Sequence, residues 1–144
     1  MNQLEFMVKT RVLFICTQNA GRSQMAEGYL QARYGDRYEA FSAGTNPGRV
    51  SRKAVAVMNE IGIDISDHWS KSIDEFAGLP MDIVITLCEC AHARCPVFSR
   101  AGKTIHRAFP DPGALAGDDE TIMQGVREIR DEIGAWIDAE FGTV

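Results

Sequence analysis

The chain has 144 residues, of which 45% are hydrophobic and 24% are charged, and its formal net charge at pH 7 is -5. This length predicts one domain with a substantial core, and the composition is that of an ordinary globular protein. Nucleic acid is not an expected partner, because its binding normally needs a basic face. A membrane is not expected either, because no apolar run approaches the roughly 18 residues of a membrane span.

The first ten residues, MNQLEFMVKT, lack the basic and then apolar pattern of a secretory signal. We therefore expect residues 1–10 to form an N-terminal extension and residues 11–144 to form the folded domain. Without an export signal, the expected location is the cytoplasm, where the four cysteines would remain reduced thiols. We expect a monomer.

Short apolar runs alternate with helical patterns along the chain. The predicted strands are residues 11–15, 38–42, 82–87 and, more weakly, 104–109. The predicted helices are residues 22–34, 51–61, a short one at 73–76, and 119–141. In the last helix apolar residues recur every three or four positions, and Gly142 provides a plausible stop. This alternation predicts a single three-layer α/β domain, with a four-stranded parallel sheet and helices on both faces.

Three chemically reactive stretches directly follow predicted strands: residues 16–22, 88–95 and 111–112. Parallel sheets bind ligands beyond the carboxyl ends of their strands. The three stretches are therefore expected to meet on one rim of the sheet, although they are far apart in the sequence.

The first stretch combines a cysteine with the start of a helix. Cys16 follows the first strand, and a helix N-terminus together with the Arg22 guanidinium would favour its nucleophilic thiolate form. The same donors would hold a tetrahedral oxyanion, with Arg22 gripping two oxygens. The predicted oxyanion-binding residues are Thr17, Gln18, Asn19, Ala20, Gly21 and Arg22.

Individual residues in this loop suit that role. Asn19 tolerates a left-handed backbone, and Gly21 removes a side chain where the loop must close. Ser23 could form a hydrogen bond with the Cys16 sulfur. A nucleotide-binding P-loop is excluded, because the Gly-Lys-Ser/Thr ending that it needs is absent.

The motif of Cys16, five residues, Arg22 and Ser23, placed after the first strand, resembles the low-molecular-weight protein tyrosine phosphatase family. Further segments resemble the arsenate reductase branch of that family: RSQMAEG at 22–28, SAG at 42–44, GIDIS at 62–66 and ITLC at 85–88. The resemblance covers about residues 11–141. It implies the phosphatase-like fold and a reaction that begins with attack of the Cys16 thiolate on a tetrahedral oxyanion.

The resemblance also assigns a proton donor. Asp111 and Pro112 match the general-acid loop of the family, so Asp111 would protonate the leaving oxygen. By itself an Asp-Pro pair would indicate only a turn.

Reduction of arsenate needs further thiols, because a second thiol must attack the sulfur of the cysteine–arsenate adduct and leave the electron pair on arsenic. The resemblance to thioredoxin-coupled arsenate reductases implies that Cys88 attacks and forms a disulfide with Cys16. Cys95 would then attack Cys88 and carry the disulfide to the surface for reduction by thioredoxin. An additional thiol, Cys90, makes Cys88-Glu-Cys90 resemble a glutaredoxin-coupled subgroup, so glutaredoxin or glutathione remains an alternative reductant and Cys90 an accessory redox residue.

Phosphatases of this fold hold the tyrosine ring between aromatic side chains. The stretches after Gly44 and Pro112 contain no aromatic residue, which favours a small inorganic oxyanion: arsenate, with phosphate or sulfate as analogues. Hydrolysis of phosphate monoesters is the alternative activity.

A non-enzymatic alternative is a zinc module. Its ligands would be Cys88, Cys90, His92 and Cys95, which are suitable residue types. The Cys-X-Cys spacing is tighter than usual for zinc, however, and this interpretation leaves Cys16 and Arg22 unexplained. We expect no metal and no cofactor.

Some family members bind potassium through Asn, Glu, Ser and Asp side chains. Asn19, Glu27 and Ser42 match three of these, but Lys71 stands at the fourth position. We expect the Lys71 ammonium group to replace the ion. His68 is assigned only a surface or packing role.

Overall fold

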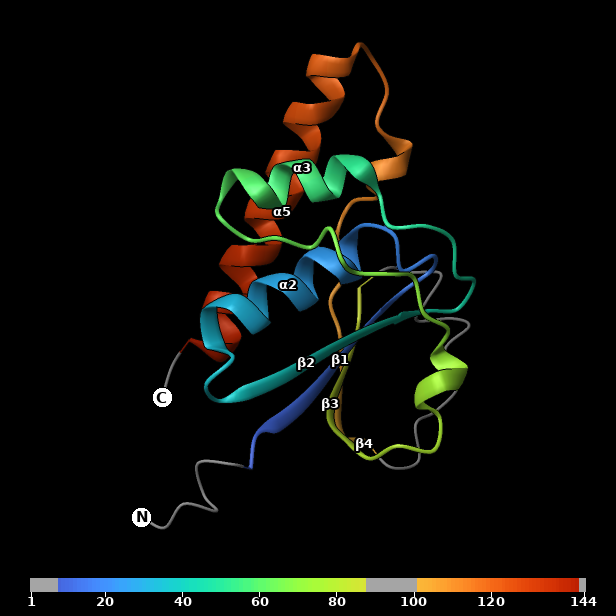
Figure 1. Cartoon of the computed structure of the whole chain (residues 1–144), viewed down its shortest axis with the longest axis vertical. Helices are drawn as coiled ribbons and strands as arrows, with labels where there is room; N and C mark the ends of the chain where they lie inside the picture. The colour runs from blue at the N-terminus through green and yellow to red at the C-terminus, as the bar shows by residue number, and fades with distance from the viewer. Residues whose placement is uncertain (1–7, 88–100, 143–144) are drawn as a thin grey trace.

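The computed structural model describes residues 8–87 and 101–142. The strands are β1 (Thr10–Cys16), β2 (Tyr38–Gly44), β3 (Met81–Thr86) and β4 (Ala101–His106). The helices are α2 (Arg22–Tyr34), α3 (Arg52–Glu60) and α5 (Asp119–Phe141), with 3-10 turns η1 (Ile73–Phe76) and η2 (Pro112–Ala114). Figure 1 shows the strands side by side with the helices packed around them.

The four strands form one parallel sheet in the order β2-β1-β3-β4, which confirms the predicted α/β architecture. Cys16 is the last residue of β1 and pairs with Gly44, the last residue of β2. On the other side, Ile15 pairs with Thr86 of β3. Cys16 therefore lies at the carboxyl end of a central strand, where ligands of such sheets bind.

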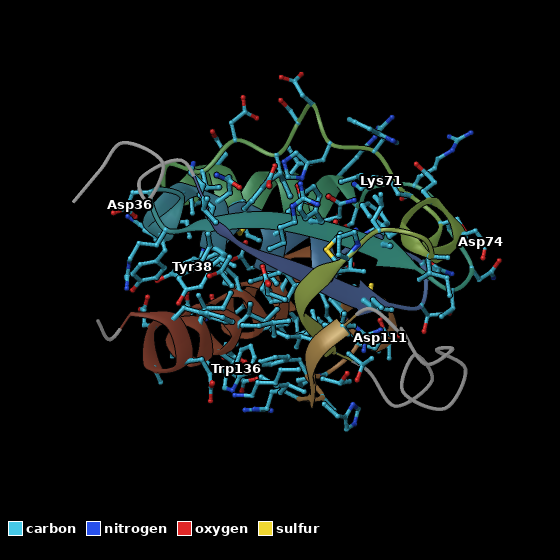
Figure 2. All side chains as sticks on the ribbon, turned by 90° about the horizontal axis from the view of Figure 1, so that it is seen from below. Asp36, Tyr38, Lys71, Asp74, Asp111 and Trp136 are labelled. Atoms are coloured by element: carbon cyan, nitrogen blue, oxygen red, sulfur yellow. The ribbon has the colours of Figure 1, made fainter. Side chains whose placement is uncertain are left out.

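Both faces of the central strand are covered. Every residue from Val12 to Cys16 is at most 2% exposed, and successive side chains of a strand point to opposite faces. In Figure 2, α5 with Trp136 lies below the sheet, and the segment carrying Lys71 lies beside β2, where Ser72 forms a parallel bridge with Gly44. The long helix buries an apolar stripe at the predicted spacing, which comprises Val126, Ile129, Ile133 and Ile137.

The predicted fourth strand, residues 104–109, was wrong in its bounds. The strand begins and ends three residues earlier, at Ala101 and His106, and it is mostly exposed. Phe109 misled the prediction: it is buried, but it lies beyond the strand, where its N–H donates to the Leu87 carbonyl at 2.9 Å. Apart from β4, the predicted elements agree with the structure to within two residues at either end. Among the described helices, none has the length and apolar character that crossing a bilayer requires.

Candidate active site

The Cys16 thiol faces the first turn of α2. The residue is 2% exposed, and its Sγ lies 2.8 Å from the hydroxyl oxygen of Ser23. The sulfur therefore lies at the N-terminal end of a helix, where the helix dipole favours an anion. The expected contact between Ser23 and Cys16 is present in the structure.

Between Cys16 and α2 the backbone turns sharply. Asn19 has φ = 53°, the left-handed conformation for which it was singled out. Its buried side chain holds this turn: Nδ2 donates to the Ser23 hydroxyl at 2.7 Å, and Oδ1 accepts from the Lys71 backbone N–H at 2.8 Å. The end of β2 lies close to the backbone of this turn: a Cβ on Gly44 would lie 2.6 Å from the Thr17 carbonyl oxygen.

Asp111 reaches the site from the other half of the chain. Its Oδ1 lies 3.7 Å from Nη2 of Arg22, and it also accepts from the N–H of Gly113 at 2.9 Å, which fixes the turn. Arg22 in turn donates to the Phe109 carbonyl at 3.2 Å. The Arg22 side chain is only 12% exposed and the Asp111 side chain 56%, so a buried cation lies behind an accessible carboxyl group. This is the order that an oxyanion site with a proton donor at its mouth requires.

A cleft of about 940 Å³ opens over these groups. The charged side chains that line it are Arg22, Arg49, Lys53 and Asp111. Among the described residues, Arg49 and Lys53 have no ion-pair partner. The cleft is thus locally cationic although the chain as a whole carries a net charge of -5.

The cleft also has an apolar part, to which Phe109, Pro112, Leu115, Ile122 and Val126 contribute. Phe109 contributes the one aromatic ring in the described lining and is 4% exposed. No described aromatic side chain therefore stands in the mouth, as the sequence led us to expect.

Lys71, which stands at the fourth position of the potassium site found in some family members, lies beside Glu27. Nζ of Lys71 lies 3.8 Å from Oε1 of Glu27 and donates to the Trp69 carbonyl at 2.9 Å. The Ser42 hydroxyl donates to the same Glu27 oxygen at 2.5 Å. These residues do not fit a cation site, because the ammonium group already neutralises Glu27. The described residues also contain no cluster of three or more metal-ligating side chains.

Gln24 was not among the predicted site residues. It is fully buried on α2 and forms hydrogen bonds to Asn19, His68 and Trp69. A glutamine beside the reactive Ser23 in an otherwise small or apolar helix face was the available signal. His68, expected on the surface or in packing, lies half-buried against Gln24.

The predicted redox residues Cys88, Cys90 and Cys95, and the alternative zinc ligand His92, lie outside the described residues. Leu87, the last described residue before Cys88, lies beside β1: its N–H donates to the Ile15 carbonyl at 2.8 Å.

Comparison with known proteins agrees with this geometry. Residues 11–139 match the family model of low molecular weight phosphotyrosine protein phosphatases. Arsenate reductase 1 of Staphylococcus epidermidis is 42% identical over 132 residues, which cover 92% of this chain and 96% of the relative.

Two solved structures have the same fold. One, described as an arsenate reductase in the phosphate binding state, has a TM-score of 0.78 and 30% identity, and the match covers 90% of this chain and 95% of that one. The thioredoxin-dependent arsenate reductase of Corynebacterium glutamicum has a TM-score of 0.65 and 31% identity. This match covers 94% of this chain and 64% of that one. By sequence and by structure, this chain belongs to the low molecular weight phosphotyrosine protein phosphatase family.

Proposed function

We propose that the protein is an arsenate reductase that reduces arsenate to arsenite and is regenerated by thioredoxin. The observation that carries the proposal is the convergence of the Cys16 thiol, the loop that follows it and the Arg22–Asp111 pair at one mouth. The similarity to arsenate reductases supports the same activity, and one of the similar structures is a thioredoxin-dependent arsenate reductase. We place the enzyme in the cytoplasm as a monomer.

In the first step the Cys16 thiolate attacks arsenic. The backbone N–H groups of residues 17–22 and the guanidinium of Arg22 bind the remaining oxygens and stabilise the charge that develops on them. Asp111 gives a proton to the departing hydroxyl, which leaves as water. The product is a sulfur–arsenic(V) adduct on Cys16.

In the second step the thiolate of Cys88 attacks the sulfur of Cys16. The sulfur–arsenic bond breaks, its electron pair stays on arsenic as arsenite, and a Cys16–Cys88 disulfide forms. Cys95 then attacks Cys88, so that thioredoxin reduces a Cys88–Cys95 disulfide. Leu87, which precedes Cys88 in the sequence, donates its N–H to the carbonyl of Ile15, which precedes Cys16, and this supports a direct attack of Cys88 on Cys16.

Coupled turnover tests the proposal. Arsenate-dependent NADPH oxidation should occur with thioredoxin and thioredoxin reductase, and much less with glutaredoxin and glutathione. Cys16→Ser should abolish both this activity and hydrolysis of an aryl phosphate, whereas Cys88→Ser should abolish only the first. An enzyme that hydrolyses aryl phosphate but releases no arsenite with either reductant would instead be a phosphatase, and stoichiometric bound zinc would favour the zinc module.

The final disulfide is tested by peptide mapping after one equivalent of arsenate. We expect Cys95→Ser to stop after one round with a Cys16–Cys88 disulfide, and Cys90→Ser to lose much less activity. A dominant Cys88–Cys90 disulfide in the unmodified protein would assign the last step to Cys90, although a ring with one intervening residue is difficult to close without strain.

A further inference from the structure

A chain of buried side-chain hydrogen bonds ends at the reactive sulfur. His68 Nδ1 lies 2.8 Å from Oε1 of Gln24, and Nε2 of Gln24 donates to Oδ1 of Asn19 at 2.9 Å. Nδ2 of Asn19 donates to the Ser23 hydroxyl at 2.7 Å, and this hydroxyl lies 2.8 Å from the Cys16 sulfur. Gln24, Asn19 and Ser23 are fully buried, so water does not compete for these contacts.

The amide of Gln24 has only one orientation that satisfies its neighbours. Its Nε2 lies within hydrogen-bond distance of three oxygens: the Asn19 carbonyl at 3.1 Å, the Asn19 side-chain oxygen and the Trp69 carbonyl at 2.9 Å. All three oxygens can only accept, so the nitrogen of Gln24 must face them. Oε1 therefore faces His68, whose Nδ1 must carry the proton that bridges them; this nitrogen also lies 3.6 Å from Oε2 of Glu27.

The orientation of the Gln24 amide also determines which atoms of Asn19 and Ser23 act as donors. Oδ1 of Asn19 accepts from Gln24 and from the Lys71 backbone N–H, which leaves its Nδ2 for the Ser23 hydroxyl. Ser23 thus receives a hydrogen bond and keeps its own proton for Cys16. From His68 to Ser23, each donor is thus directed toward the sulfur, and a thiolate can accept the last hydrogen bond. Hydrogen bonds that are aligned in this way polarise one another.

We propose that Gln24 is a positioning residue which, supported by His68, orients this chain so that the Ser23 hydroxyl donates to the Cys16 thiolate. The inference rests on Cys16 being the nucleophile of the proposed reaction. The competing interpretation is purely structural, namely that Gln24 only fastens the segment that carries His68 and Trp69 to α2.

The test measures the reactivity of Cys16 and needs no arsenate. In a full-length background in which the other three cysteines are replaced by serine, Cys16 is alkylated with iodoacetamide across a range of pH. Gln24→Met keeps the side-chain length but removes every hydrogen bond, and Gln24→Glu keeps the acceptor for His68 but removes both donors. Gln31→Glu is the matched control, because it makes the same change at an exposed position of α2.

We expect both Gln24 variants to move the midpoint of alkylation upward by about one pH unit, an approximately tenfold slower reaction at low pH, with an unchanged plateau at high pH. The charged groups that line the cleft, Arg22, Arg49, Lys53 and Asp111, are untouched, so they are common to all variants. Gln31→Glu should match the parent. A folded Gln24→Met protein with the parental profile overturns the proposal, whatever its melting temperature.

A second pair of variants decides the matter if the Gln24 variants fail to fold. His68→Leu removes the donor to Gln24, whereas His68→Asn places an amide N–H close to the position of Nδ1. We expect a two- to fourfold slower reaction at low pH for His68→Leu and parental behaviour for His68→Asn. Equal rates for these two variants overturn the proposal. Absence of arsenate turnover in the unmodified protein would reject the proposed function while leaving this measurement valid.

Discussion

Gly44 is the position where a single methyl group should damage the oxyanion site most directly. It is the last residue of β2 and pairs with Cys16. A Cβ added there would lie 2.6 Å from the Thr17 carbonyl oxygen, 2.8 Å from the Asn19 backbone nitrogen and 2.9 Å from the Gln18 carbonyl carbon. All three atoms belong to the backbone of the loop that is to bind the oxyanion, so none of them can rotate away.

The size of the effect follows from these distances. Real Cβ contacts essentially never fall below 3.0 Å, so Gly44→Ala must move the loop or the strand by at least 0.4 Å. Misplacement of a reacting group by about 1 Å costs roughly 100-fold in rate, so a shift of this size should lower kcat/KM for arsenate at least about sixfold. Overpacking of this kind also costs about 1–3 kcal/mol in the free energy of unfolding.

Gly48→Ala provides the matched control. Its added Cβ would approach only the side chain of Gln18, at 3.7 Å or more, which is an ordinary contact. Steady-state arsenate reduction, phosphate binding by calorimetry and urea unfolding should be measured for both variants. Parental kinetics and phosphate affinity in Gly44→Ala would refute the inference that close approach of β2 shapes the loop, and equal losses in Gly48→Ala would show that any substitution in this region is harmful.

Three further outcomes are expected. The melting temperature should not change when sodium is exchanged for potassium, whereas Lys71→Asp should become more stable in potassium; a potassium-dependent rise in the unmodified protein would contradict the role given to Lys71. Lys53→Gln should lower kcat/KM for arsenate severalfold at low salt and much less at high salt, as steering by an unpaired cation requires; a loss of the same size at every ionic strength would contradict steering. Burial and the hydrogen bond to Asp138 raise the pKa of Tyr29 to about 12. The neutral phenol therefore stabilises the folded protein below pH 10, and this stabilisation is lost as the pH rises toward 12. Tyr29→Phe should remove this contribution to the loss of stability at alkaline pH, as measured by urea titrations.

The fold was predictable where burial and periodicity act together. The central strand β1 is buried from Val12 to Cys16 and the long helix α5 carries a regular apolar stripe, and both were located from their residues alone. The predicted position of β4 was three residues too late, because most of its side chains are exposed and the apolar pattern carries little information there. Phe109 gave a false signal: its burial beside the cleft depends on a contact with Leu87, which is far away in the sequence.

The same distinction holds for the site. Cys16, Arg22 and Ser23 lie close together in the sequence and follow a strand, so their meeting could be expected. Gln24 and His68 meet only because the segment after α3 passes behind the loop, and no local pattern reports that path. The partners of buried polar side chains are set by tertiary structure, and they are therefore the part of an active site that sequence alone describes least well.

The distribution of charge explains why the net charge argues against nucleic acid as a partner but not against a small oxyanion. Two carboxylates near the loop have a cation beside them: Glu27 lies next to Lys71 and Asp111 next to Arg22. Arg49 and Lys53 line the same cleft with no such partner among the described residues. A net charge of -5 therefore opposes a long polyanion, which would meet the whole acidic surface, whereas a single oxyanion meets only the local field. If the low-salt loss in Lys53→Gln is found, this local excess of positive charge is what admits arsenate to an acidic protein.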